Sequence, residues 1–164
     1  MDSKLETAYL AGGCFWGVED LIKKLDGVVS TDVGYSGGDT SKKTYNEVKT
    51  GTTGHAEAIK IVFESEKLSY GKLLDFFFTI HDPTTLNQQG NDKGTQYRSA
   101  IFFNSSEQEG EAHKAIERAS KSGLWKKEIV TKLEPFEEFI LAEDYHQDYL
   151  QKNPGGYTCH WIRK

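Results

Sequence analysis

A strand gives way to a helix within residues 7–17, Thr7-Ala8-Tyr9-Leu10-Ala11-Gly12-Gly13-Cys14-Phe15-Trp16-Gly17. Residues 7–11 are apolar and short enough for a strand, and apolar residues then recur at helical spacing from Val18 to Leu25, until Asp26-Gly27 ends the run. Cys14 is therefore expected at or near a helix N-terminus. Unpaired N–H groups and the positive end of the helix dipole favour an anion there, so the thiol should ionise more readily than a free cysteine.

Two interpretations of Cys14 are open. A lone cysteine in a domain is commonly a small buried hydrophobic residue. Phe15 and Trp16 favour a nucleophile instead, because two large aromatic rings in the first turn fit the amphipathic stripe poorly and resemble the wall of an apolar pocket. The flanking Gly13 and Gly17 would let another backbone or a ligand come close.

The length of 164 residues predicts a single domain, 1–164, large enough to bury a core without disulfides or a structural metal. A net charge of −5 without a long basic stretch argues against a nucleic-acid or anionic-membrane surface. The N-terminal residues lack a signal-peptide pattern, and no stretch is apolar enough to span a bilayer. We therefore expect a soluble, cytoplasmic protein, a monomer, whose two cysteines are free or transiently paired.

Periodicity predicts the remaining elements. Strands are expected at 28–33, 56–63, 97–103 and 129–133, and helices at 69–80, 105–122 and 142–150. Ser69 is the expected N-cap of the helix 69–80, and Ser105 that of the helix 105–122. Residues 34–55 and 84–96 are expected to be long loops, and 135–140 to be irregular or extended. Long loops in a compact domain are commonly functional.

The order of these elements predicts the fold class. Strand, helix, strand, strand, helix and strand follow one another, and a further helix, a strand and a C-terminal extension come after them. This order fits an α+β two-layer sandwich with a ferredoxin-like split βαβ core, extended by the C-terminal helix, strand and long coil.

Glu57 occupies an unusual position in the strand 56–63. Alternation places its side chain on the same face as Ile59, Ile61 and Phe63. If that face is buried, loss of solvation raises the pKa of the carboxyl group, which suits a general acid. The alternative is that Glu57 lies at the end of the strand and protrudes into water.

These residues together fit a thiol-based reductase. If the substrate is supposed to be a sulfoxide, a choice that goes beyond what these residues imply, Cys14 would attack its sulfur, a neutral acid and tyrosine hydroxyls would assist the departing oxygen, and an aromatic cage would hold the methyl group. The enzyme sulfur would emerge as a sulfenic acid, with which a second cysteine can condense to a disulfide. Cys159, on the C-terminal tail, is the candidate.

Five motifs, in order, resemble peptide methionine sulfoxide reductase, A type. They are Gly12-Gly13-Cys14-Phe15-Trp16-Gly17, Gly34-Tyr35-Ser36-Gly37-Gly38, Gly54-His55-Ala56-Glu57, the run from His81 through Asp92, and Gly94-Thr95-Gln96-Tyr97-Arg98-Ser99. The resemblance runs from about Thr7 to the tail. It implies reduction of the S epimer of methionine sulfoxide, free or in proteins, in the repair of oxidative damage, with no bound cofactor and with thioredoxin as the reductant.

The resemblance also implies roles for individual residues. Cys14 resembles the nucleophile and Glu57 the acid that protonates the oxygen, with Tyr35 and Tyr97 as hydroxyl partners on that oxygen. The residues that resemble substrate-binding residues of the family are Phe15, Trp16, Asp92 and Tyr157.

The tail matches the family less closely, because Thr158 separates Gly156-Tyr157 from Cys159. Cys159 is expected to resolve the sulfenic acid; otherwise glutathione or glutaredoxin would act on Cys14 directly.

Two rival interpretations place Cys14 in other chemistry. One is a cysteine hydrolase or acyltransferase with His55 or His146 as the base. The other is a zinc site of Cys14, His55, Cys159 and His160, which lacks any typical ligand spacing. His146 is otherwise expected to be a packed or surface residue of a helix.

Overall fold

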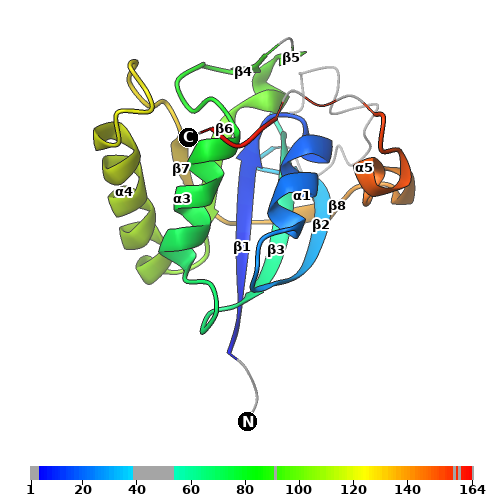
Figure 1. Cartoon of the computed structure of the whole chain (residues 1–164), viewed down its shortest axis with the longest axis horizontal. Helices are drawn as coiled ribbons and strands as arrows, with labels where there is room; N and C mark the ends of the chain where they lie inside the picture. Colours follow the sequence, from blue (N-terminus) through cyan, green and yellow to red (C-terminus); the bar gives the residue numbers. More distant parts are fainter. Residues whose placement is uncertain (1–3, 39–53, 91, 157, 159, 164) are drawn as a thin grey trace.

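The structure, a computed structural model, describes residues 4–38, 54–90, 92–156, 158 and 160–163. Helices and strands are mixed along the chain (Figure 1), which confirms the α+β class. The strands are β1 (Leu5–Gly12), β2 (Val28–Ser36), β3 (Ala56–Glu64), β4 (Gln88–Gln89), β5 (Asp92–Lys93), β6 (Ser99–Phe103), β7 (Lys132–Pro135) and β8 (Phe139–Leu141). The α-helices are α1 (Phe15–Lys23), α3 (Tyr70–Ile80), α4 (Ser106–Lys121) and α5 (Tyr149–Lys152), with 3₁₀ turns η1 (Thr95–Tyr97) and η2 (Asp144–His146).

Six strands form one sheet in the order β7-β6-β1-β3-β2-β8. All neighbouring pairs are antiparallel except β6 and β7, which run parallel. The register of β2 and β3 places Tyr35 opposite Glu57. Since residues directly opposite each other point to the same face, these two side chains share one side of the sheet.

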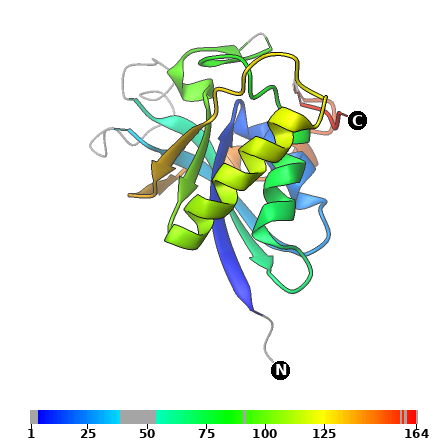
Figure 2. The same cartoon turned by 90° about the vertical axis from the view of Figure 1, so that its left-hand side faces the viewer.

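Three helices, α1, α3 and α4, cover one face of this sheet (Figures 1 and 2). The main core lies between the helices and the sheet and contains Ile59, Ile61 and Phe63 of β3 together with Ile22 of α1 and Phe77 of α3, all fully buried. Glu57 is therefore on the helix-covered face, directly in line with the core residues of its own strand.

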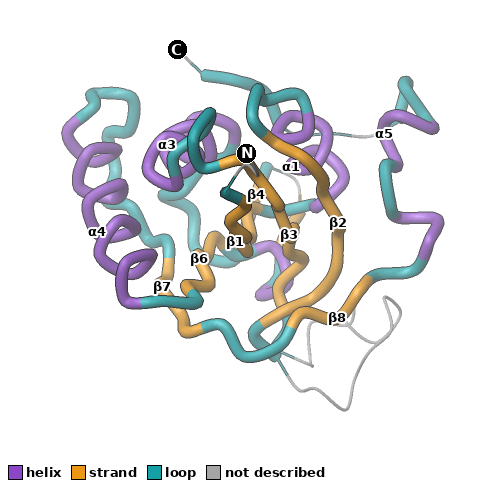
Figure 3. Tube along the Cα trace, turned by 90° about the horizontal axis from the view of Figure 1, so that it is seen from below, coloured by secondary structure: helices purple, strands orange, loops and turns teal. Residues whose placement is uncertain are grey.

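The opposite face is covered by the connection from β7 to β8. These two strands lie at opposite edges of the sheet, so the chain between them must cross its whole width (Figure 3). Phe136 in this connection stacks on Tyr9 of β1 with ring centroids 3.9 Å apart, and Phe139 packs against the same ring at 5.7 Å. Both faces of the central strands are thus buried.

The predicted helix starts are confirmed. Cys14 is the N-cap of α1, the Ser69 hydroxyl accepts a hydrogen bond from the Lys72 amide, and the Ser105 hydroxyl accepts one from the Gln108 amide. The two serine hydroxyls satisfy amides that a helix leaves without an internal partner. None of the described helices is both long and apolar enough to cross a membrane.

Several predicted boundaries are wrong. Strand β2 continues to Ser36, so Tyr35 lies in a strand instead of a loop, because pairing with both β3 and β8 continues to that end. Tyr97 lies in the turn η1, and β6 begins two residues later. The expected strand 129–133 is shifted to β7, and the expected helix 142–150 is only η2 and the short α5. The segment 135–140, expected to be irregular or extended, contains the start of β8.

Candidate active site

Cys14 lies where β1 leads into α1. Its side chain is 8% exposed and the thiol is not in a disulfide. Gly13, just before it, has φ of 98°, a left-handed conformation that glycine adopts without strain and that turns the chain from the strand into the helix. The predicted position at a helix N-terminus is confirmed, and the ready ionisation of the thiol stays a prediction.

Glu57 lies beneath the first turn of the same helix. Its carboxylate oxygen Oε1 accepts a hydrogen bond from the Phe15 amide at 3.2 Å, so the carboxyl group contacts the residue next to Cys14. The side chain is 2% exposed, and burial raises the pKa of Glu57 to about 8. The hydrogen bond from the Phe15 amide lowers this pKa, and the negative charge of Asp92 raises it further. The alternative that Glu57 protrudes into water is therefore wrong, and its carboxyl group holds a proton at neutral pH.

Tyr35 is fully buried beside Glu57. Its hydroxyl donates a hydrogen bond to Oε1 of Glu143 at 3.2 Å, and the hydroxyl of Tyr145 donates to Oε2 of the same carboxylate at 3.3 Å. Burial, together with the negative charges of Glu143 and Glu57, raises the pKa of Tyr35 far above its usual value. The phenol therefore keeps its proton at any physiological pH.

The two aromatic residues after Cys14 have different environments. Phe15 is 1% exposed and packs against Tyr35 with ring centroids 5.8 Å apart. Trp16 is only partly buried; its ring stacks on Tyr149 at 3.8 Å, and its indole Nε1 donates a hydrogen bond to Nδ1 of His146 at 3.0 Å. Tyr149 thus covers one face of the Trp16 ring, and His146 accepts a hydrogen bond from its polar edge.

Asp92 and Tyr97 lie in the segment between α3 and β6, both partly buried. Asp92 is close enough to Glu57 for its charge to raise the pKa of that carboxyl group. Arg98, next to Tyr97, donates to the carbonyl oxygens of Gly54 and Thr95 at 3.0 Å and of Gly37 at 3.3 Å. One guanidinium therefore joins the segments that contain Tyr35, Glu57 and Tyr97.

The C-terminal tail returns to the start of α1. Nε2 of His160, a buried side chain, lies 2.7 Å from the Gly12 carbonyl oxygen, and a side chain on Gly17 would collide with both His160 and Thr158. Tyr157 and Cys159 themselves lie outside the described residues. Their described neighbours nevertheless place the tail beside the Cys14 turn.

No group of three His, Cys, Asp or Glu side chains within the described part of the chain is arranged to hold a metal ion. Of the four proposed zinc ligands, Cys159 falls outside that part.

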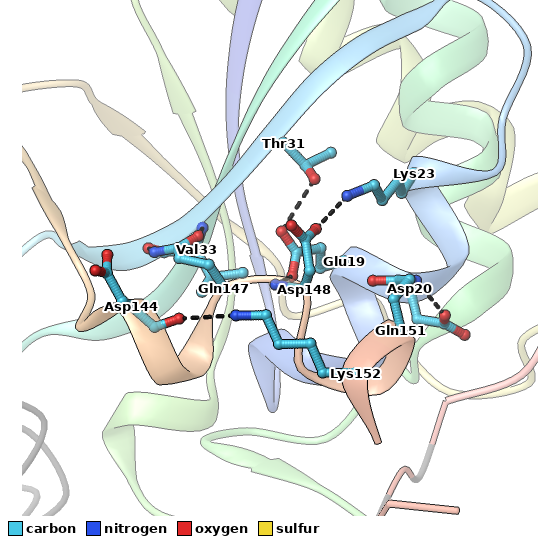
Figure 4. Close-up of polar contacts among 10 residues, drawn as sticks. All are labelled: Glu19, Asp20, Lys23, Thr31, Val33, Asp144, Gln147, Asp148, Gln151 and Lys152. Carbon is cyan, nitrogen blue, oxygen red and sulfur yellow. Dashed lines mark hydrogen bonds and ion pairs between the residues drawn. The ribbon is translucent and has the colours of Figure 1, made fainter. Parts of the chain in front are cut away.

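The segment 142–152, which we call the strap, binds to both β2 and α1 (Figure 4). Its Gln147 side chain accepts from the Val33 amide and donates to the Val33 carbonyl oxygen, both at 2.8 Å. Its Asp148 amide donates to Oε1 of Glu19 at 2.8 Å, and the Asp148 carboxylate pairs with Lys23 of α1. The strap therefore bridges α1 and β2, the elements that carry Trp16 and Tyr35.

The family model of peptide methionine sulfoxide reductase matches residues 6–164. The chain belongs to this family. It is 54% identical over 158 residues to peptide methionine sulfoxide reductase MsrA 2 of Rhodopirellula baltica, covering 96% of this chain and 92% of the relative. This membership confirms the predicted family and does not favour the hydrolase interpretation.

Solved structures of the family have the same fold. The crystal structure of Mxr1 from Saccharomyces cerevisiae in reduced form has a TM-score of 0.93 and 42% identity, covering 98% of this chain and 93% of that one. Mxr1 in complex with Trx2 has a TM-score of 0.66 and 26% identity, covering 100% and 96%.

Four residues support the site in ways that the sequence did not predict: Glu19, Glu143, Gln147 and His160, the last of which was considered only as a zinc ligand. Each is polar and buried or partly buried, and each bonds to a residue far away in the chain. The sequence offered one signal for Glu143 and Gln147: they lie in residues 142–147, a run dense in polar residues that follows an apolar stretch. His146 is 1% exposed, in agreement with the expected packed residue, but it lies in a 3₁₀ turn instead of a helix.

Proposed function

We propose that this chain reduces the S epimer of methionine sulfoxide, free or in proteins, with Cys14 as the nucleophile. The hydrogen bond from the Phe15 amide to Glu57 is the observation that carries the proposal. It ties a buried carboxyl group that is protonated at neutral pH to the backbone of Phe15, the residue next to a cysteine at a helix N-terminus. A sulfoxide reductase needs both, because the sulfur must be attacked and its oxygen must be protonated.

In the first step, the Cys14 thiolate bonds to the sulfoxide sulfur while Glu57 gives its proton to the oxygen. The hydroxyl group is then transferred to the Cys14 sulfur, and the bond between the two sulfurs breaks to release the thioether. Methionine gains two electrons, and Cys14 loses two and becomes a sulfenic acid. The low exposure of Glu57 favours this role, since a solvated glutamate would already be ionised.

The surrounding residues would bind the sulfoxide. Tyr35 and Tyr97 would donate hydrogen bonds to its oxygen, and the opposite positions of Tyr35 and Glu57 in the sheet support a shared target. Tyr35 would have to turn its O–H away from Glu143 to do so, because a hydroxyl has a single proton to donate. Phe15 and Trp16 would form the apolar wall for the methyl group. Asp92 and Tyr157 would complete the substrate site, and the effect of Asp92 on Glu57 supports its proximity.

Cys159 would regenerate the enzyme. Its thiol would condense with the Cys14 sulfenic acid, releasing water and forming a disulfide that thioredoxin then reduces. The position of Thr158 and His160 against Gly17 supports this role, as does the complex of the yeast relative with Trx2. Direct attack of glutathione or glutaredoxin on Cys14 is the alternative route, and neither route requires a bound cofactor.

We further propose that one domain, 1–164, carries the activity, working as a cytoplasmic monomer. Its two-layer core is proposed to be of the ferredoxin-like split βαβ type. The strand order β6-β1-β3-β2, with α1 and α3 as the crossover helices, supports that description.

The test is a single turnover of prereduced protein with the separated S and R epimers of a methionine sulfoxide peptide, without added reductant, followed by mass analysis. Reduction of the S epimer alone, with loss of two hydrogens from the protein, is expected. Reduction with a persistent sulfenic acid would retain the function and remove Cys159 from it. No reduction of either epimer would refute the proposal.

A further inference from the structure

The β4–β5 hairpin lies against the turn that carries Cys14, at the end of the sheet toward which β1 runs (Figure 1). Gln89 of β4 is 3% exposed, and the methylene groups of its side chain lie on Gly13. A Cβ atom on that glycine would be 2.5 Å from Cγ of Gln89 and 2.7 Å from its Cβ, which is closer than such atoms can approach. Gln89 therefore contacts the residue immediately before Cys14.

The amide group of Gln89 holds the hairpin to the end of α3. Its Oε1 accepts a hydrogen bond from the Asp82 amide at 2.9 Å, and its Nε2 donates to the carbonyl oxygen of the same residue. One side chain thus pairs with both backbone groups of one residue, as a neighbouring strand does in an antiparallel sheet. We call this pairing the Gln89 clamp. Two directional bonds that must be satisfied together fix both the position and the rotation of the amide group.

Asp82 is a firm base for the clamp. The preceding residue, His81, is fully buried, and its two ring nitrogens lie 2.7 Å and 2.8 Å from oxygen atoms of α3 and β6. The His81 ring also packs against Gly12, where a Cβ atom would lie 3.2 Å from it. The clamp and its base therefore contact two successive residues, Gly12 and Gly13, of the turn before Cys14.

Asp92 is the residue of the hairpin that acts on the site. In the pairing of β4 with β5 it lies directly opposite Gln89, so both side chains point to the same face of the hairpin. That face is the one with which Gln89 contacts Gly13. The negative charge of Asp92 raises the pKa of Glu57, whose carboxyl group lies beneath the first turn of α1. The position of the hairpin therefore determines how strongly the two carboxyl groups interact.

We propose that Gln89 is a positioning residue for sulfoxide reduction, holding the β4–β5 hairpin on the Gly13 turn so that the Asp92 carboxylate lies beside Glu57. The inference rests on the proposed function for the use of the Glu57 proton, whereas the arrangement itself rests on the contacts of Gln89. A carboxylate at close range makes ionisation of a neighbouring carboxyl group more costly. Gln89 thereby keeps Glu57 protonated at a higher pH than burial alone would.

Other titratable groups surround the Glu57 carboxyl group. Tyr35 lies opposite it on β2, His55 precedes it by two positions, Cys14 begins α1, and Tyr97 belongs to η1, which packs against β3. None of these belongs to the hairpin. Their charges are therefore common to the parent protein and to variants of the hairpin.

The substitution Gln89→Met separates the clamp from packing. Methionine keeps the methylene groups that lie on Gly13 and nearly the length of glutamine, but it cannot pair with the two backbone groups of Asp82. Gln88→Met is the matched control, because Gln88 is the neighbouring residue of β4, points to the opposite face and takes no part in the clamp. Asp92→Asn removes the charge and keeps the shape of the side chain.

The direct readout is the carboxyl ¹³C resonance of Glu57 in the reduced protein, assigned by its absence in Glu57→Gln and followed from pH 5 to pH 10. The titration midpoint of the parent protein is expected near the pKa of about 8. It should fall by about one pH unit in Asp92→Asn and by at least about half a unit in Gln89→Met, and stay within about 0.2 unit in Gln88→Met. In an Asp92→Asn background, Gln89→Met should change the midpoint by less than about 0.2 unit, because the charge that it positions is gone.

An unchanged midpoint in Gln89→Met would overturn the inference. An equal fall in the Asp92→Asn background would also overturn it, because loosening of the turn alone would then explain the effect. If Gln89→Met failed to fold, Asp92→Asn would still decide, since a midpoint equal to that of the parent protein would mean that the hairpin has no charge to position.

Single-turnover rates should follow the same titration, since only the protonated acid can transfer its proton. Relative to the parent protein, Gln89→Met should lose about two- to fivefold in rate at pH 8 and little at pH 6, where Glu57 is protonated in both proteins. An equal loss at both pH values would show a structural defect and overturn the inference. Failure of the proposed function would instead appear as a parent protein that shows the same titrations but reduces no sulfoxide.

Discussion

Replacing Glu57 by glutamine is expected to stabilise the fold, and to do so increasingly as the pH rises. In the folded protein the pKa of this carboxyl group is about 8, mainly because burial disfavours the charged form, whereas a free glutamate has a value of 4.5. Between these values the folded chain retains a proton that the unfolded chain has released. Unfolding then liberates a proton, so a higher pH favours the unfolded state.

The magnitude follows from the separation of the two pKa values. Linkage predicts that the native Glu57 lowers the free energy of unfolding by roughly 1 kcal/mol at pH 5 and by roughly 4 kcal/mol at pH 8. Glutamine has no charge to bury, and its carbonyl oxygen can still accept the hydrogen bond from Phe15. The stability difference between the two proteins should therefore grow by about 3 kcal/mol across this range. If the glutamine amide packs better or worse than the carboxyl group, the stability difference shifts by the same amount at every pH, and its increase with pH is unchanged.

The assay is urea unfolding of both proteins at pH 5, 6, 7 and 8 in the presence of a reductant, followed by tryptophan fluorescence. Glu19 is also buried, with its pKa raised to about 7, but it contributes equally to both proteins and cancels in the difference. Glu107→Gln, at an exposed position, is the control and should show no such slope. A difference between Glu57→Gln and the parent protein that is independent of pH would refute the reasoning.

In single-turnover assays Glu57→Gln should keep substantial activity, because an amide can still hydrogen-bond the sulfoxide oxygen, whereas Glu57→Ala should lose most of it; equal losses would mean that the proton itself is indispensable. Cys159→Ser should reduce about one equivalent of the S epimer and then stop when thioredoxin is the reductant, since no disulfide is presented to it; many turnovers would refute a resolving role. Gln147→Leu should lower the free energy of unfolding by about 1–2 kcal/mol in urea, because the Val33 amide loses its acceptor while the Val33 carbonyl oxygen keeps the bond from the Ala142 amide; a loss below about 0.5 kcal/mol would show that water or a neighbouring group replaces the Gln147 amide.

Sequence patterns predicted the features that depend on neighbouring residues. The N-caps Ser69 and Ser105 act on amides three residues away, and the helix after Cys14 depends on its own apolar spacing. Alternation along a single strand placed Glu57 on the apolar face but left its burial open, and the structure shows that it is buried. The motifs around Cys14, Tyr35, Glu57 and Tyr97 were sufficient to indicate the family.

Patterns failed where an element exists only because of a distant partner. Strand β8 has three residues and is defined by pairing with Gly34, Tyr35 and Ser36, more than a hundred positions earlier. Residues 142–150 of the strap were expected to form a helix because apolar residues recur there at helical spacing. The structure instead places Asp148 at φ of 55°, where its amide reaches the Glu19 carboxylate. Such a bond offers no periodic signal.

The strap also affects how the protein matures during synthesis. Cys14 and Trp16 leave the ribosome before the strap. The carboxylate that binds Tyr35 follows 108 residues after that tyrosine, and the imidazole that binds Trp16 follows 130 residues after that tryptophan. At typical elongation rates of about 5–20 residues per second, the nascent thiol waits on the order of ten seconds or more before its surroundings exist. A chain truncated before the strap would contain the reactive cysteine with its glycines and aromatic neighbours, yet its pocket would be unfinished. Assembly of the site therefore waits for synthesis of the strap.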